Sequence, residues 1–327
     1  EGDGEMANPR DSAVEEIEPA DSLPYPEFGA PLRAETKSTL VSAGSGMGFL
    51  HTLREVMRVR MAKFAAVVLF VTLIAAVFAP WLAPYDPTKS KPWDSLQAPS
   101  SKYWLGADRL GRDQLSRLIY GARISLIIGV GGVSMAVILG VLIGVTAGWY
   151  GHFWDEVLMR FMDSLSAFPS LLLALSLVAI TGATVINIIL VVGIVGTPWV
   201  ARVIRSQVLS VREREFIMAV TGMGAPPLRI MLKHLIPNCM APVIVQASLS
   251  VAAAILLEAS LSFLGVGVKP PTPTWGGMLR GAFETMDQAP WLTLSPGVAI
   301  FLVVLAFNFM GDALRDVLDP KLKGSRL

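Results

Sequence analysis

Long apolar runs divide this chain into stretches that each have the length of a membrane-spanning helix. A bilayer core about 30 Å thick needs about 20 apolar residues in a helix. The runs that meet this condition are 64–82, 124–149, 158–180, 185–203, 241–263 and 291–310. Because no water reaches the backbone inside lipid, each run has to be helical. The pattern therefore predicts an all-α integral membrane protein with about six transmembrane helices.

Lysine and arginine residues gather in three polar segments of the chain. These are the juxtamembrane segment at 51–63, the loop at 204–240 and the C-terminal tail at 313–327. Positively charged residues are enriched on the cytoplasmic side of a membrane, and six spans bring all three segments to one side. We therefore predict a six-helix transmembrane domain at 64–312, with both termini and the 204–240 loop in the cytoplasm. The segment between the first two runs is also basic, but aspartates accompany its charges, and the six-span topology places it outside.

Small residues recur at every fourth position along the second apolar run. Gly140, Gly144 and Gly148 continue a series that begins with Gly132 and Ala136. Residues four apart share one face of a helix, and a strip of small side chains lets another backbone approach closely. The strip predicts close helix packing inside the bundle, in preference to a pore-lining face.

Composition supports a membrane location and narrows the chemistry. The chain is 53% hydrophobic and 16% charged, whereas soluble domains carry about a quarter charged residues. A net charge of +1 excludes a strongly basic nucleic-acid binder. The single cysteine, Cys239, cannot form an internal disulfide, and three histidines leave little material for a metal site, so none is expected. Residues 1–50 are acidic and poor in large apolar side chains, which predicts a disordered cytoplasmic tail and not a secretory signal.

The 204–240 loop contains two predicted helical segments. Residues 215–224 form the first, which ends at glycines, and two prolines then restart the chain, since proline suits the first turn of a helix. The second is amphipathic and continues to Pro237, with apolar residues at helical spacing: Leu228, Met231, Leu232 and Leu235. Its apolar stripe fits either a groove on a partner protein or the membrane surface. Periodicity alone leaves both interpretations open.

The order of residues in this loop resembles the cytoplasmic loop of ABC importer permeases. That pattern is Glu-Ala-Ala, three residues, Gly, nine residues, Ile-x-Leu-Pro. Placing its Gly on Gly224 puts Met218-Ala219-Val220 on the first triplet and His234-Leu235-Ile236-Pro237 on the last. The spacing is intact, although Met218, Val220 and His234 depart from the residue types of the pattern.

Further blocks resemble the C-type permease of the dipeptide, oligopeptide and nickel branch of this family. They are FAPWLAPYDP at 78–87, LGADRLGRD at 105–113 followed by YGARISL at 120–126, and EASLSFLGVG at 258–267, extended by PTWGGM at 273–278. The resemblance covers residues 50–323 and implies a type I ABC importer permease (MetI-like) bundle with a cytoplasmic coupling helix. Such a chain is a multi-pass protein of the bacterial cytoplasmic (inner) membrane and forms half of a translocation pathway for peptides or related small solutes.

The resemblance also implies partners and a coupling role for the loop. The partners are a homologous B-type permease, two cytoplasmic ABC ATPase subunits, an extracytoplasmic substrate-binding protein and membrane lipid. ATP and Mg belong to the ATPase subunits, so this chain needs no cofactor and is not an enzyme. The expected ATPase-coupling residues are Glu215, Phe216, Ala219, Gly222, Gly224, Leu228, Leu232, His234 and Pro237.

Glu258 stands inside an otherwise apolar run. An intramembrane carboxylate is costly and is expected to face the bundle interior. Glu258 and Ser262 are therefore candidates for the translocation pathway or for gating, and the alternative is a structural, hydrogen-bonded site near the external end of the fifth run.

Two further functions from other classes deserve comparison. A membrane-embedded hydrolase would use Glu258 or Asp163 with a nucleophile such as Ser260, but no nucleophile and base stand at a readable spacing. A self-sufficient channel would need a selectivity filter, and no plausible filter occurs in the sequence. The sequence also contains no Gly-x4-Gly-Lys-Ser/Thr phosphate loop, so the chain does not hydrolyse ATP by that route.

Overall fold

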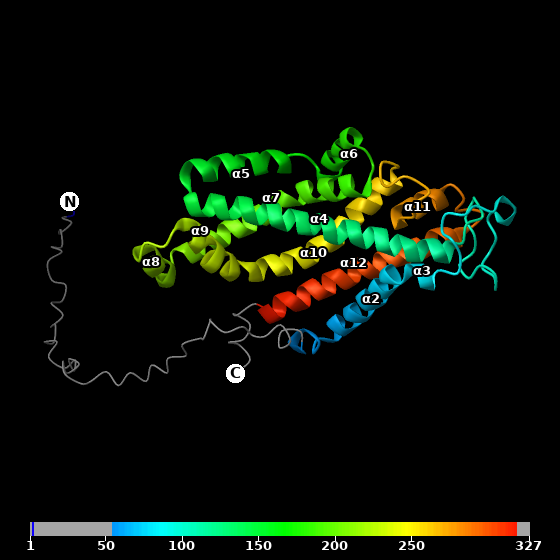
Figure 1. Ribbon diagram of the computed structural model, residues 1–327, viewed down its shortest axis with the longest axis horizontal. Coiled ribbons are helices and arrows are strands. Elements are labelled where there is room, and N and C mark those ends of the chain that lie inside the picture. The colour runs from blue at the N-terminus through cyan, green and yellow to red at the C-terminus, as the bar shows by residue number, and fades with distance from the viewer. Residues whose placement is uncertain (1, 3–53, 319–327) are drawn as a thin grey trace. The chain divides into compact units, whose positions relative to one another are not determined.

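The computed structural model describes residue 2 and residues 54–318, and its regular structure there is helical (Figure 1). The predicted tail at 1–50 and the end of the C-terminal tail lie outside the described residues, apart from residue 2. Within residues 54–318 the one β-type contact is an isolated bridge between Ala107 and Asp113. The helical elements are α2 (Arg60–Val77), α3 (Ala79–Leu82), η1 (Pro92–Asp94), α4 (Gln114–Tyr150), α5 (His152–Ser166), α6 (Ser170–Thr181), α7 (Val185–Arg212), α8 (Glu215–Gly222), α9 (Pro227–Ile230), η2 (Met231–Leu235), α10 (Ile236–Phe263), α11 (Trp275–Phe283) and α12 (Pro290–Leu318).

The number of membrane-spanning helices agrees with the sequence prediction. Five helical stretches are long and apolar enough to cross a membrane, or six if the bent pair α5 and α6 forms one span. The predicted span at 158–180 is divided in the structure, because α5 and α6 meet at an angle of 92°. Pro169 explains the break: proline has no backbone N–H and disfavours a helical conformation in the residue before it. α6 accordingly begins directly after Pro169.

The first predicted span is also interrupted. The expected run at 64–82 divides into α2, which ends at Val77, and the short helix α3. Pro80 occupies the first turn of α3, where its missing N–H costs little. The other long helices extend beyond the predicted apolar runs. α4, for example, begins ten residues earlier than the run at 124–149, with Asp113 as its N-cap.

The glycine strip of α4 lies against α7, and the two helices pack along much of their lengths (Figure 1). A Cβ atom on Gly140 would lie 2.6 Å from Val200 Cβ, and one on Gly144 would lie 2.5 Å from the carbonyl oxygen of Ala201. A Cβ atom on Gly148 would meet Val208 at 2.8 Å. These distances are shorter than van der Waals contact, so the approach of the two backbones depends on glycine.

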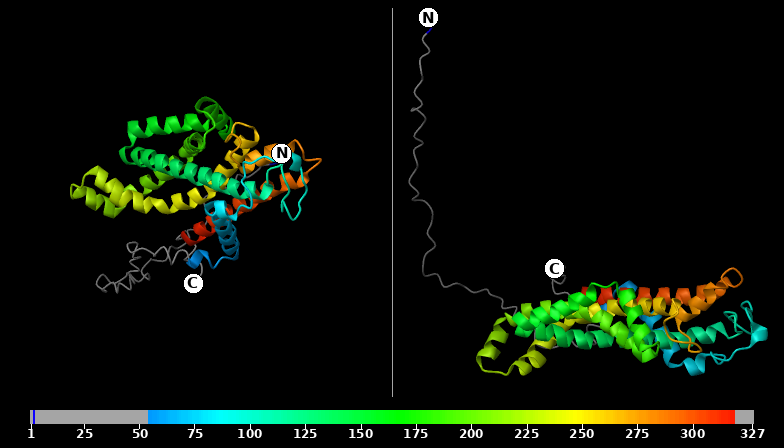
Figure 2. Two further views of the ribbon diagram at one scale, coloured as in Figure 1. Left: turned by 45° about the vertical axis from the view of Figure 1, so that its right-hand side comes forward. Right: turned by 90° about the horizontal axis from the view of Figure 1, so that it is seen from above.

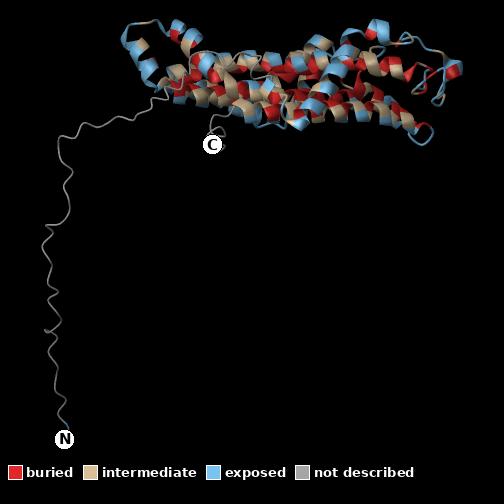
Figure 3. Ribbon diagram, turned by 90° about the horizontal axis from the view of Figure 1, so that it is seen from below, coloured by how far each residue is buried: buried red, intermediate tan, exposed pale blue. Residues whose placement is uncertain are grey.

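The remaining long helices pack beside this pair. α10 contacts α4, α7 and α12, and α2 packs on α12, as the views of Figure 2 show. Buried residues follow the contacts between the helices, whereas outward faces carry exposed apolar side chains (Figure 3). On α2, for example, Val67, Phe70 and Val71 are exposed. Such a surface is stable in lipid or against another apolar protein surface.

The two ends of the helix bundle carry different structures. α8 and α9 form one end, and α3, α11 and the segment 83–113 form the other (Figure 1). Two regions singled out in the sequence therefore occupy opposite ends of the bundle. They are the 204–240 loop and the blocks around 105–113 and 258–278.

Candidate functional site

The 204–240 loop folds as a helical hairpin anchored on the bundle. Ile217 of α8 and Ile230 of α9 are almost completely buried, and they pack in one apolar cluster with Val208 of α7 and Leu235 of η2. Since burying an Ile side chain contributes roughly 1.5–3 kcal/mol, these contacts hold the hairpin in a defined position. The loop is therefore a structured surface.

Gly224 forms the turn between α8 and α9. Its φ angle is +79°, in the left-handed region that glycine adopts without strain. The amide of Gly224 donates to the carbonyl oxygen of Thr221 at 2.9 Å, and the amide of Ala225 donates to that of Val220 at 3.3 Å. A Cβ atom on Gly224 would meet no atom of residues 54–318 within 4 Å. The backbone conformation thus favours glycine here, and the described part of the chain leaves the space beside it open.

Large apolar side chains cover the outer face of this hairpin. They are exposed by 39% to 77% of their surface: Phe216, Met218, Met223, Leu228 and Leu232. The hairpin also carries Arg229 and Lys233, both exposed. We refer to the five exposed apolar residues as the hairpin surface. A cluster of this kind on a polar loop is typical of a binding surface for another protein or for a membrane.

The predicted apolar stripe of the second segment divides between two faces. Leu228 and Leu232 point outward, whereas Met231 and Leu235 are buried against the bundle. Residues four apart share a helix face, so each pair keeps its own direction. Met231 and Leu235 therefore anchor the hairpin on the bundle, whereas Leu228 and Leu232 belong to its exposed surface.

Pro237 does not end the helical segment, contrary to the sequence prediction. η2 is a π-helix, and α10 follows it directly with Pro237 in its first turn. A π-type turn changes the hydrogen-bonding partner of each residue, which accommodates a proline that cannot donate. The second half of the hairpin therefore runs without a break into the long helix α10.

The other residues predicted for coupling lie on the same hairpin. Glu215, Ala219 and Gly222 are exposed on α8. His234 is half-buried, and its carbonyl oxygen accepts a hydrogen bond from Asn238 Nδ2 at 2.7 Å. The structure places these residues on the same helical hairpin. Their coupling role remains a prediction.

Glu258 lies at the opposite end of α10 in a pocket of hydroxyl groups. Its side chain is completely buried. Ser262 Oγ donates to Oε1 at 2.8 Å, and Ser125 Oγ of α4 donates to Oε2 at 3.2 Å. Within residues 54–318 Glu258 forms no ion pair. This geometry joins α10 to α4 and matches the structural alternative considered for Glu258, whereas Ser262 reaches a cavity at the bundle end.

The geometry gives no support to the hydrolase hypothesis. Ser260 Oγ donates to the carbonyl oxygen of Leu256 at 2.8 Å, on a different side of α10 from the Glu258 pocket. Asp163 lies on α5 and forms an ion pair with Arg202 at 3.2 Å. Neither carboxylate is paired with the proposed nucleophile, so the nucleophile lacks the base that activation requires.

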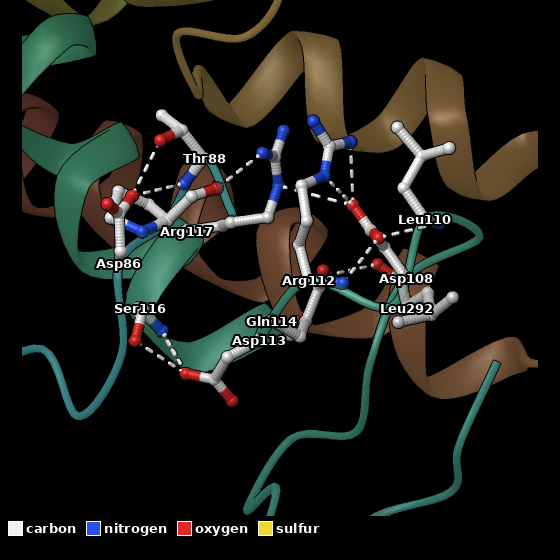
Figure 4. Close-up of polar contacts among 12 residues, drawn as sticks. Asp86, Thr88, Asp108, Leu110, Arg112, Asp113, Gln114, Ser116, Arg117 and Leu292 are labelled. Atoms are coloured by element: carbon white, nitrogen blue, oxygen red, sulfur yellow. Dashed lines mark hydrogen bonds and ion pairs between the residues drawn. The ribbon is translucent and has the colours of Figure 1, made fainter. Parts of the chain in front are cut away.

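A polar cluster at the α11 end of the bundle was missed by the sequence analysis. Asp108 Oδ2 accepts from Arg112 Nε at 2.7 Å and lies 3.5 Å from Arg117 Nε. Arg117 Nη1 also donates to the carbonyl oxygen of Pro87 at 2.9 Å. Figure 4 shows the two guanidinium groups next to each other above Asp108. Asp108 and Arg112 lie in a non-helical turn before α4, so their spacing of four residues predicts no contact between them.

The segment 83–113 is held by a second polar group. Asp94 is buried and accepts hydrogen bonds from Lys102 Nζ at 2.9 Å and from the Tyr103 hydroxyl at 2.8 Å. The hydrogen bond from Lys102, followed by that from Tyr103, lowers the pKa of the Asp94 carboxyl below its usual value. Burial and the neighbouring carboxylate raise the pKa of the Tyr103 hydroxyl. These bonds give the segment a fixed fold.

A helical bundle with five or six candidate spans defines the class of multi-pass membrane proteins, and the hairpin at one end adds an exposed apolar surface. Comparison with known families names that class. A family model described as the binding-protein-dependent transport system inner membrane component matches residues 140–324, and one described as the N-terminal TM domain of oligopeptide transport permease C matches residues 51–99. The chain therefore belongs to the inner membrane components of binding-protein-dependent transport systems.

Curated relatives agree over most of the chain. The dipeptide transport system permease protein DppC of Alkalihalophilus pseudofirmus is 42% identical over 84% of this chain and 90% of its own length. The di/tripeptide transport system permease protein DppC of Pseudomonas aeruginosa is 47% identical, over 79% and 88%. The glutathione transport system permease protein GsiD of Escherichia coli is 43% identical, over 83% and 90%. The resemblance to the C-type permeases is thus confirmed, and this chain is a permease of an ABC importer, located in the inner membrane.

Among solved structures, a chain of the MetNI methionine ABC transporter in an inward-facing conformation is similar to this chain. The TM-score is 0.47 at 19% sequence identity, and the match covers 62% of this chain and 96% of that chain.

Proposed function

We propose that this permease imports short peptides, and that the hairpin around Gly224 couples it to an ATPase in the cytoplasm. The chain forms half of the translocation pathway and a homologous permease forms the other half. ATP and Mg are bound by two separate ATPase subunits, and an extracytoplasmic binding protein delivers the peptide. Both termini and the hairpin lie in the cytoplasm. Relatives named as permeases for dipeptides, di/tripeptides and glutathione support a cargo of two or three residues.

The hairpin surface is the observation that supports coupling. Met223, Leu228 and Leu232 are exposed although the elements that carry them are anchored by buried isoleucines. A rigid apolar surface fits a preformed groove on a protein, in which an amphipathic helix presents residues at i and i+4. Leu228 and Leu232 have that spacing, and Met223 lies beside the open turn at Gly224.

The continuity of η2 with α10 supports a mechanical role. A nucleotide-driven movement of the ATPases displaces the hairpin, and α10 carries the displacement to Glu258 and the α11 end of the bundle. ATP binding then shifts the balance between two states of the bundle, because it interacts differently with each.

The proposal is tested with an affinity-tagged permease purified from native membranes in a mild detergent. We expect the wild-type chain to recover a second permease and ATPase subunits, and cells that contain it to take up a radiolabelled dipeptide. Leu228→Glu should lower ATPase recovery and uptake by at least about tenfold, because loss of a central apolar contact typically costs about 2 kcal/mol. Recovery of the chain alone in several detergents, or unchanged uptake in L228E, would contradict the proposal.

A matched control separates docking from folding. Ile217→Glu places the same charge in the same hairpin, but at a buried position. It is expected to reduce the amount of folded permease in the membrane, whereas L228E is expected to leave that amount unchanged. If L228E lowers the amount of folded permease as much as I217E does, its effect on uptake is one of stability. Leu228 would then not belong to a coupling surface.

A further inference from the structure

Two adjoining cavities lie between the start of α4, the end of α10 and α11. Their volumes are about 340 and 400 Å³. Arg112 and Arg117 line both of them, together with Gly277 and Gly281 of α11. Cavities of roughly 300–1,000 Å³ are the size that small-molecule ligands occupy. The pair is at the opposite end of the bundle from the coupling hairpin.

The charges around these cavities do not balance. The lining contains two carboxylates, Asp108 and Glu284, and five basic residues: Arg109, Arg112, Arg117, Lys269 and Arg280. Asp108 already pairs with Arg112 and Arg117, and Glu284 already pairs with Arg109. Lys269 and Arg280 have no ion-pair partner in the part of the chain that is described. The two cavities together therefore have an excess of positive charge, which a bound anion would neutralise.

The two arginines that line both cavities, Arg112 and Arg117, are held in place by other groups of the chain. Arg117 is buried and is fixed by Asp108 and the carbonyl oxygen of Pro87, and its guanidinium group lies beside that of Arg112 (Figure 4). Arg280 lies directly over the backbone of Gly265: a Cβ atom there would fall 1.2 Å from Arg280 Nη1. Gly265 has a φ angle of +88°, so the chain turns sharply beneath the guanidinium group. Cations oriented before a ligand arrives lose little freedom on binding, and this applies to Arg112 and Arg117, whereas Arg280 and Lys269 are exposed at the cavity.

We propose that the larger cavity binds the free C-terminal carboxylate of a short peptide. Arg280 and Lys269 supply the charge, because guanidinium and ammonium groups form strong charge-assisted hydrogen bonds with carboxylates. Hydroxyl groups of Ser262, Thr272 and Thr274 line the same cavity and provide neutral partners for the peptide backbone. The site rests on the proposed peptide cargo and adds to it a recognition step in the permease itself.

The size of the cavity favours a small solute over a protein side chain from a docked partner. A volume of about 400 Å³ encloses a molecule of dipeptide size. Ser262 also connects the cavity to the buried Glu258, to which it donates a hydrogen bond at 2.8 Å. A ligand at Ser262 thus touches the helix that runs continuously to the coupling hairpin.

The test measures binding of dialanine to the full chain in lipid nanodiscs, without the binding protein, by saturation-transfer NMR. Alanyl-alaninamide, which lacks the carboxylate, serves as the matched ligand. We compare the wild-type chain with Arg280→Gln and with Lys269→Gln, an exposed position at which folding is not at risk. Arg123→Gln is the control, because Arg123 is an exposed arginine of α4 outside both cavities.

We expect dialanine to bind the wild-type chain and R123Q equally, and to bind R280Q and K269Q at least about tenfold more weakly. Loss of one charge-assisted bond of about 1.5 kcal/mol corresponds to that factor. Equal binding of dialanine and its amide, or wild-type affinity in both variants, would overturn the carboxylate site. Displacement of dialanine by inorganic phosphate at equal concentration would also overturn it, since the cavity would then be a general anion site.

Uptake by the assembled importer is measured in parallel. The two measurements distinguish a failure of the carboxylate site from a failure of the proposed peptide import. Wild-type uptake of dialanine without binding to the nanodisc-embedded chain would overturn the site and leave the permease function standing. Carboxylate-dependent binding together with no uptake of any dipeptide or tripeptide would support the site and contradict the peptide cargo. In the importer, K269Q is expected to lower the maximal uptake rate and to leave KM unchanged, because the binding protein captures the peptide first.

Discussion

Arg205 on α7 and Asp155 on α5 form a two-point ion pair. Arg205 Nη2 donates to Asp155 Oδ2 at 2.6 Å, and Nε donates to the other carboxylate oxygen. This planar geometry is the strongest form of an arginine–carboxylate contact. α5 is otherwise a helix with an exposed face, on which Phe153, Trp154 and Phe161 are uncovered. The pair is thus one of two ion pairs that join α5 to α7, the other being that of Asp163 with Arg202.

Asp155→Ala is expected to loosen α5 from α7. The pair is partly exposed, so its contribution to the free energy of unfolding is about 1 kcal/mol. Faster hydrogen exchange should be confined to α5, and the α4 glycine strip should stay protected. The matched control is Glu156→Ala, since Glu156 pairs within α5 with Arg160 and does not reach α7. Equal exchange rates in the two variants would show that the ion pair between Arg205 and Asp155 does not stabilise the attachment of α5 to α7.

Glu258→Ala is expected to destabilise the contact between α10 and α4. Removal of the carboxylate leaves the buried hydroxyls of Ser125 and Ser262 without their acceptor, at a cost of about 1–3 kcal/mol. Glu258→Gln keeps an acceptor oxygen and nearly the same volume, and it should restore most of the loss. The measurement is thermal unfolding of the purified chain in detergent. A glutamine variant as unstable as the alanine variant would indicate that the negative charge, and not the hydrogen bonding, is required.

The fold of the segment 83–113 is expected to depend on pH at both extremes. The Asp94 pKa is lowered by Lys102 and Tyr103, so its contribution to stability is present above its ordinary value of 3.8 and is lost as the pH falls further. The pKa values of Lys102 and Tyr103 are raised, so their contributions are present below about pH 10 and are lost as the pH rises. The NMR signals of the Tyr103 ring report the change, since this ring is buried in the folded segment. Asp94→Asn should abolish the acid transition, and an unaltered acid transition in D94N would assign it to another group.

Much of the helical architecture could be predicted from the sequence, because lipid permits few alternatives. An apolar run of about 20 residues has to be helical, and the six runs correspond to five spanning stretches and one bent pair. The prediction was wrong where one proline changes the local backbone. New helices begin next to Pro80 and Pro169 inside predicted runs. At Pro237 the helix continues, because a π-helical turn precedes the proline. Hydrophobicity contains no information on these choices.

The candidate site was predicted in position but not in geometry. Motif spacing placed a turn at Gly224, and the structure shows the positive φ that makes glycine necessary there. Periodicity did not show that Leu228 and Leu232 face away from the bundle while Met231 and Leu235 face it, because all four fit one helical stripe. The cluster of Arg112, Arg117 and Arg280 was missed, since it joins residues more than 160 positions apart.

Gly144→Val is expected to separate α4 from α7. The new Cβ atom would lie 2.5 Å from the carbonyl oxygen of Ala201, and backbone cannot move aside as a flexible side chain can. Overpacking of this kind costs about 1–3 kcal/mol or more, so the amount of folded permease in the membrane should fall. Gly297→Val is the control, because the nearest atom to a Cβ atom at Gly297 is 4.0 Å away. Equal losses for both variants would place the defect in membrane insertion and not in helix packing.

Gly224→Trp is expected to abolish coupling while the permease still folds. Among the described residues, no atom lies within 4 Å of the new Cβ position, so we expect the added side chain to clash with a docked partner and not with the bundle. The left-handed backbone adds a strain of about 1–2 kcal/mol for a non-glycine residue. Gly224→Asn separates the two effects, because asparagine tolerates this conformation and is small. We expect G224W to lose ATPase recovery and uptake, and G224N to keep most of both. If G224N fails as completely as G224W at equal membrane levels, backbone flexibility at the turn is what transport requires. If both variants transport normally, the hairpin does not contact the ATPase at this turn.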